Sequence, residues 1–102
     1  MTLYERIANL NNNDGLTLKK FREVVYKTGY QVATEGIEMR DASEAVKAIK
    51  RMEGSCGVWF SDGIYYIDKS HRVATKTEAL RVGKEHKQIS VLKWSDMSLV
   101  YC

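Results

Sequence analysis

The sequence contains no proline, so its turns must be made by other residue types. Glycine, asparagine, aspartate and serine are the remaining residues that favour turns. Histidine is scarce as well, with two residues, and no cysteine or histidine pair has the spacing of a metal site. A glycine-rich phosphate-binding loop is also missing. We therefore expect a protein without metal, cofactor or catalytic residues, which is not an enzyme.

Cysteine is limited to Cys56 and Cys102, too few for a disulfide framework. The sequence also lacks a signal-peptide pattern, and no apolar run approaches the roughly 20 residues that span a bilayer. These absences predict a soluble cytoplasmic protein with free thiols and no membrane partner.

The size and composition of the chain are ordinary for a globular protein. Its 102 residues predict a single domain over 1–102, and hydrophobic and charged residues make up 44% and 28%. The net charge of +3 is smaller than a dedicated nucleic-acid-binding domain usually carries.

Three capping patterns predict three helices. Thr2 with Glu5 forms a capping box that predicts a helix over about 3–11, ended by the turn-favouring run 11–15. Asp41 opens a second helix that stops at Gly54. Its apolar stripe is Ala42, Ala45, Val46, Ile49 and Met52. A second capping box starts at Thr75 and predicts a third helix over about 76–86, with Gly83 inside it.

The clearest strand signal is a hairpin. Residues 57–60 and 64–67 are rich in aromatic and β-branched side chains and flank Ser61-Asp62-Gly63. Residues 89–92 and 98–101 predict two final strands. A loop through His71 is expected between the hairpin and the third helix.

The segment 16–34 fits two structures. Leu18, Phe21, Val24 and Val25 have helical spacing, whereas 23–26 and 30–33 would form a hairpin around Lys27-Thr28-Gly29. We favour the hairpin because Val and Tyr prefer strands.

A weak internal repeat relates 29–62 to 63–96. The matching pairs lie 34 positions apart and are Gly29 and Gly63, Glu44 and Glu78, Ala45 and Ala79, Lys50 and Lys84, Ser61 and Ser95, and Asp62 and Asp96. The alternative is chance similarity. The elements together predict an α+β fold, an antiparallel sheet of about five to six strands with about three helices, arranged as two hairpin–helix repeat units.

Possible catalytic groups have simpler structural explanations. Ser70 and His71 are adjacent in sequence, which rarely aligns a nucleophile with its base. Asp62 and Asp96 fall in turns, and Cys56 starts a strand without a nearby group that would lower its pKa.

Aromatic residues give the best candidate binding site. Strand alternation requires one of Tyr65 and Tyr66 to face outward, and Trp59 also faces outward if Phe60 is in the core. With the basic side chains just beyond them, these residues would make an aromatic–basic surface for a protein or for stacked bases. The alternative is that the predicted helix over about 3–11 or a second subunit covers this face. The candidate residues are Trp59, Tyr65, Tyr66, Lys69, His71 and Arg72.

A second basic patch on the helices has a simpler alternative. Its members are Lys47, Lys50, Arg51, Arg81 and Lys84. Acidic residues interleave with them, so pairing on a solvated face is the default and phosphate binding the less favoured reading.

The capped helix 75–80, the strand 88–91 and the segments 29–33 and 57–60 resemble small accessory proteins of bacteriophages and other mobile elements, some of which are anti-CRISPR inhibitors. The resemblance covers about the last two-thirds of the chain and carries over no inhibitory residue. It implies a non-catalytic protein that blocks a host protein or nucleoprotein complex by steric occlusion. The alternatives are a nucleic-acid-binding or regulatory module and, third, an enzyme whose acidic or histidine groups the fold assembles. Open sheet edges also allow a homodimer.

Overall fold

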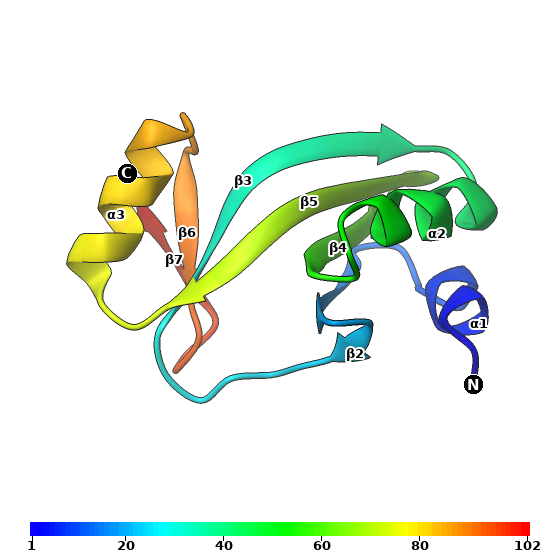
Figure 1. Ribbon diagram of the computed structural model, residues 1–102, viewed down its shortest axis with the longest axis horizontal. Coiled ribbons are helices and arrows are strands. Elements are labelled where there is room, and N and C mark those ends of the chain that lie inside the picture. The colour runs from blue at the N-terminus through cyan, green and yellow to red at the C-terminus, as the bar shows by residue number, and fades with distance from the viewer. The chain divides into compact units, whose positions relative to one another are not determined.

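The computed structural model of the protein describes all of residues 1–102 and has an α+β fold (Figure 1). Its three helices are α1 (Leu3–Ala8), α2 (Ala42–Arg51) and α3 (Lys76–Glu85). Its strands are β1 (Asp14–Lys19), β2 (Arg22–Glu23), β3 (Tyr30–Met39), β4 (Cys56–Ser61), β5 (Ile64–Val73), β6 (Ser90–Lys93) and β7 (Ser98–Tyr101). They form a seven-stranded antiparallel sheet in the order β2-β1-β4-β5-β3-β6-β7. The predicted fold class is confirmed, with slightly more strands than expected.

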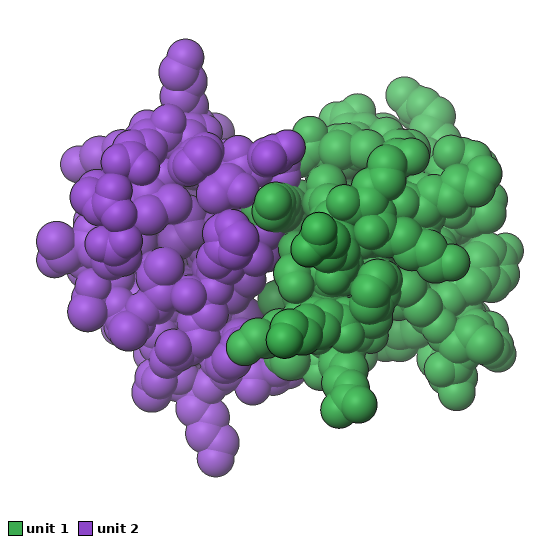
Figure 2. Space-filling model, viewed as in Figure 1, with its two compact units in different colours: residues 1–24, 36–69 green, residues 25–35, 70–102 purple.

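The chain divides into two compact units, which Figure 2 shows in green and purple. Unit 1 contains residues 1–24 and 36–69, and unit 2 contains residues 25–35 and 70–102. The strands β3 and β5 each contribute residues to both units. Each unit has its own hydrophobic core.

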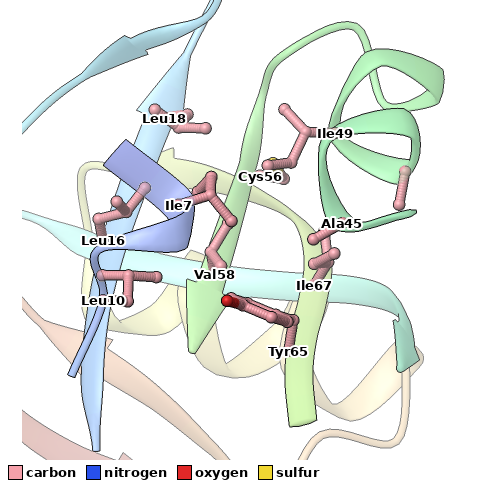
Figure 3. Close-up of a cluster of buried hydrophobic side chains, with 11 residues drawn as sticks. Ile7, Leu10, Leu16, Leu18, Ala45, Ile49, Cys56, Val58, Tyr65 and Ile67 are labelled. Carbon is pink, nitrogen blue, oxygen red and sulfur yellow. The ribbon is translucent and has the colours of Figure 1, made fainter. Parts of the chain in front are cut away.

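Unit 1 packs α1 and α2 against one face of β1, β4 and β5 (Figure 3). Alternate strand residues point to these helices, because successive side chains of a strand leave on opposite faces. The buried cluster consists of Ile7, Leu10, Leu16, Leu18, Ala45, Ala48, Ile49, Cys56, Val58, Tyr65 and Ile67. The other face of these three strands therefore carries the candidate site.

Unit 2 has a smaller core beneath α3. Val32, Ala79 and Val91 are buried there, and Val73 and Val100 pack against them. Further partly buried members are Tyr30, Leu80 and Val82. Gly83 allows α3 to pack closely on this core, because a Cβ at this position would lie 2.7 Å from Cys102 Sγ and 3.2 Å from Val91 Cγ1.

The helix starts are where the capping patterns place them. Thr2 Oγ1 accepts from the Glu5 N–H, and Glu5 Oε1 accepts from the Thr2 N–H, both at 3.1 Å. Asp41 Oδ1 accepts from the Glu44 N–H at 2.9 Å. Thr75 and Glu78 repeat this bond at 3.3 Å. α1 is shorter than expected, because it ends at Ala8 with Asn9 as its C-cap.

The predicted β4–β5 hairpin is confirmed. Ser61 pairs with Ile64, so the connecting loop consists of two residues, Asp62 and Gly63. Their φ angles are 51° and 79°, the combination that a tight hairpin turn with the right-handed twist of the strands requires. Gly63 adopts this conformation without the steric penalty that a Cβ would bring.

The predicted hairpin over 23–33 is wrong, although the preference for strands over a helix is right. Leu16 and Leu18 belong to β1, which pairs with β4 and returns into the short β2. The turn lies at Lys20 and Phe21, both with positive φ. Residues 24–29 are a connection instead, because tertiary contacts override the local β-propensity.

Two smaller expectations also need correction. Asp14 and Gly15 start β1 instead of ending a turn, because Gly15 pairs with Trp59 on β4. His71 is not in a loop, since β5 continues to Val73. Ser70 is buried in that strand and its Oγ accepts from Gln31 Nε2 at 2.9 Å, which holds this part of β5 in unit 2.

Several elements recur at a spacing of 34 positions. The strands β3 and β5 start at 30 and 64, and the ten-residue helices α2 and α3 start at 42 and 76. The residue after each C-cap, Glu53 and Lys87, has a φ of 56°. The boundaries of the two compact units fall at other positions.

Candidate functional site

Trp59 and Tyr66 lie directly opposite each other on the helix-free face of unit 1. They are Cα partners in the β4–β5 ladder, and their side chains are 46% and 36% exposed. Side chains at paired positions of an antiparallel ladder are close neighbours on the same face. The expected outward Trp–Tyr pair is therefore present in the fold.

The row containing this pair continues onto β1 at Gly15, which pairs with Trp59. A Cβ on Gly15 would lie 2.9 Å from Trp59 Cε3, so the indole ring occupies the space above the glycine backbone. Trp59 consequently lies across a strand that has no side chain at this position. The row Gly15, Trp59 and Tyr66 is called the aromatic row below.

A second row lies beside the aromatic row and consists of Thr17, Gly57 and Asp68. A Cβ on Gly57 would lie 2.8 Å from Asp68 Oδ1, so the carboxyl group lies over the Gly57 backbone. Burial raises the pKa of Asp68 to about 6, against the opposing effect of a hydrogen bond from the Gly57 backbone. The only acid in these two rows is therefore partly protonated near pH 6.

Tyr65 is not part of this surface, which corrects its inclusion among the candidate binding residues. Its side chain is 6% exposed and belongs to the core of unit 1 (Figure 3). The ring packs on Phe60, with centroids 4.5 Å apart and an angle of 35° between the planes. Burial also raises the pKa of the Tyr65 hydroxyl. The inward pair Phe60–Tyr65 and the outward pair Trp59–Tyr66 are adjacent positions of one ladder.

Lys69 and His71 are both exposed residues of β5. Lys69 ends unit 1, and strand alternation directs its side chain to the face opposite Tyr66. His71 belongs to unit 2. Lys69 is therefore not a basic neighbour of Tyr66 on the helix-free face.

Arg72 has a structural role in unit 2. Its Nε donates to the Thr28 carbonyl oxygen at 3.1 Å, and Nη2 donates to Thr28 Oγ1 at 3.0 Å. Its guanidinium carbon lies 5.3 Å from the centroid of the Tyr26 ring, a cation–π distance. Tyr26 in turn meets Trp94 edge to face at 5.4 Å. Arg72 thus fastens the connection 24–29 to the sheet.

Trp94 is the buried counterpart of the exposed Trp59. Its Nε1–H donates to Gln31 Oε1 at 3.1 Å, so its polar group has a partner inside unit 2. A buried indole normally needs such a bond. Of the two tryptophans, only Trp59 presents a large exposed surface to a partner.

The thiol of Cys56 is unsuited to nucleophilic chemistry. It is buried, and burial, with a smaller contribution from Asp68, raises its pKa to about 12. The reactive form of cysteine is the thiolate, which is scarce at neutral pH with such a pKa. No group of three or more His, Cys, Asp or Glu side chains is placed to hold a metal ion.

Two of the five basic residues of the predicted helical patch, Lys47 and Arg81, are paired with acids on the solvated surface. Arg81 donates to Glu78 at 2.6 Å and to Glu85 at 2.7 Å, and the Lys47 ammonium lies 3.3 Å from Glu44. These are the helical i,i+3 and i,i+4 pairs that the interleaved charges predict. The pairing supports a solvated helix face over a phosphate-binding patch.

The comparisons with known proteins add no relative. No protein-family model, no curated protein and no solved structure matches the chain. No helix of the protein combines the length and the apolar character needed to cross a lipid bilayer.

Proposed function

We propose that the protein is a non-catalytic binding protein and that the aromatic row of unit 1 is its site for another protein. The observation that carries the proposal is the pairing of half-exposed Trp59 with Tyr66 on a face that no helix of unit 1 covers. Tryptophan and tyrosine dominate the binding energy of protein interfaces, because they bury a large area with few rotatable bonds.

The surroundings of the pair favour a protein over a nucleic acid. Stacked bases bring phosphates with them, and proteins that stack bases add a positively charged groove for the backbone. The row beside Trp59 and Tyr66 instead holds Thr17, Gly57 and the acidic Asp68. This composition suits a flat apolar contact with a polar rim, as protein interfaces have.

Inhibition of a host defence complex stays a prediction based on the resemblance to mobile-element accessory proteins. In that case the mechanism would be steric occlusion through the same surface, with Trp59 and Tyr66 at its centre. Arg72 would not contribute, since it is engaged with Thr28 and Tyr26.

The test uses the purified chain as bait in a bacterial lysate treated with nuclease at high salt, followed by affinity measurement with the captured protein. Trp59→Ala should weaken binding by about 30-fold or more, which corresponds to a hot-spot loss of about 2 kcal/mol. The variant should stay folded, because Trp59 lies outside the core of unit 1.

Tyr4→Ala is the matched control. Tyr4 lies on α1 of the same unit and is similarly exposed, but it is on the helix side of the sheet. Its replacement should change the affinity by less than about twofold, the effect of an energetically neutral surface residue. Equal losses from both variants, or unchanged binding by Trp59→Ala, would contradict the aromatic row as the site.

A further inference from the structure

The outermost strand of unit 1 is protected against pairing with another chain. β2 has two residues, Arg22 and Glu23, and both are charged. The Glu23 carboxylate also binds Arg6, with both nitrogen–oxygen distances at 3.0 Å. Short length and charge are the usual means by which proteins block edge-to-edge association.

The outermost strand of unit 2 has neither protection. β7 runs from Ser98 to Tyr101 without a charged residue, and it pairs on one side only, with β6. Leu99 and Tyr101 are 55% and 68% exposed. Val100, between them, packs against the core beneath α3. The free edge of unit 2 is thus uncharged and carries apolar side chains.

The backbone of β7 also has unused hydrogen-bonding groups. The Cys102 N–H donates to the Ile89 carbonyl oxygen at 2.9 Å, so Cys102 faces β6 with its polar backbone atoms. In an antiparallel ladder the direction of these groups alternates along the strand. Val100 therefore also faces β6, while the N–H and C=O groups of Leu99 and Tyr101 point to the free edge.

The 34-position spacing gives β7 a counterpart in the sheet. β7 starts at Ser98, 34 positions after the start of β5 at Ile64. β5 lies between two strands, β4 and β3, whereas β7 has β6 alone. The position next to β7 is the counterpart of the one that β3 fills beside β5.

We propose that this edge pairs with a second copy of the chain, β7 to β7 and antiparallel. Centring the pair on Val100 places Leu99 opposite Tyr101 of the partner subunit. In this register the outward N–H and C=O groups of Leu99 and Tyr101 meet complementary groups of the other copy. The exposed apolar side chains also meet across the ladder without any charge, so the edge is complementary to itself under a two-fold axis.

Sedimentation velocity of the full chain between about 1 and about 500 µM tests the proposal, a range that covers the weak association expected of a short edge contact. The wild type should shift from monomer to dimer as concentration rises. Tyr101→Pro should stay monomeric throughout. Proline at this position removes an N–H that points to the free edge and leaves the β6 ladder intact. Tyr101→Ala keeps the N–H and should weaken the dimer by only about tenfold.

A second variant covers the case in which Tyr101→Pro fails to fold. Leu99→Lys adds a charge to the exposed side of the edge strand and should also give a monomer with unchanged thermal unfolding. A wild type that remains monomeric, or a folded Tyr101→Pro that dimerises like the wild type, would overturn the proposal. Loss of the dimer in Trp59→Ala would overturn it too, because it would assign self-association to the aromatic row.

Discussion

Asp68 is the ionisable residue with the clearest link between its position and stability. Its carboxyl group lies on the helix-free face of unit 1 over Gly57, and burial raises its pKa to about 6 from an ordinary 3.8. Between these two values the folded chain binds more protons at this site than the unfolded chain. The free energy of unfolding contributed by Asp68 must therefore fall as pH rises from about 4 to about 6.

Asp68→Asn should remove this dependence on pH. As pH rises over that range, the unfolding free energy of the variant should increase relative to that of the wild type, by up to about 1.4 kcal/mol per pH unit. Urea unfolding of both proteins from pH 4 to pH 7 measures it. Hydrogen bonds lower the pKa values of five other carboxyl groups, so these groups make stability rise with pH. Both proteins contain them, so their contributions cancel in the difference; they are Glu5, Glu23, Asp41, Glu78 and Asp96. A difference that is constant with pH would contradict the buried position of the carboxyl group.

The identity of the outward tyrosine depends on one residue in a turn. A two-residue loop at Asp62 and Gly63 pairs Ser61 with Ile64, and counting outward then pairs Trp59 with Tyr66. A three-residue loop that included Ser61 would instead pair Trp59 with Tyr65. Asp-Gly is typical of the two-residue turn, so the pairing of Trp59 with Tyr66 could have been predicted from the sequence. The role of Arg72 had no such signal, because its partners Thr28 and Tyr26 lie more than forty positions away along the chain.

At the level of elements, local signals predicted the helices well and long-range contacts decided the strands. The starts of α2 and α3 follow from hydrogen bonds that span three residues, Asp41 to Glu44 and Thr75 to Glu78. β1 has a weaker local pattern and is defined by its pairing with β4, about forty positions later. The connection 24–29 was mistaken for part of a hairpin because Tyr26 packs on Trp94 instead of pairing in a strand, and Val25 is left exposed.

The two caps differ in strength, which gives a prediction at this scale. Asp41→Ala should destabilise the protein by about 1–2 kcal/mol, since it removes both an acceptor and a negative charge from the start of α2. Thr75→Ala should cost less, about 0.5–1 kcal/mol, because its bond to the Glu78 N–H is longer and its cap is neutral. Thermal unfolding of both variants checks the order, with Asp41→Asn as the control that keeps a capping oxygen. A larger loss from Thr75→Ala would contradict this account.

For nucleic-acid binding by the whole molecule, the pairing of individual charges matters as well as the net charge of +3. Arg6, Lys47 and Arg81 each form an ion pair within their own unit. Binding to phosphates would have to replace these pairs, whereas a cation without a partner only has to release counterions. The mild net charge therefore works against strong association with nucleic acids, and the pairing of these three among the 16 Lys and Arg residues adds a smaller contribution.

The chain should therefore bind single-stranded DNA or RNA only weakly. Fluorescence anisotropy with a labelled oligonucleotide should show at most weak binding at about 20 mM salt, and that binding should be lost by about 150 mM salt. Trp59→Ala should leave the weak binding unchanged. The row beside Trp59 consists of Thr17, Gly57 and Asp68, so it contains an acidic residue and no basic residue that could bind a phosphate. Submicromolar binding that survives about 150 mM salt and disappears in Trp59→Ala would instead assign base stacking to the aromatic row. In that event the cations for the phosphates would have to come from outside these two rows, and the protein would be a nucleic-acid-binding module.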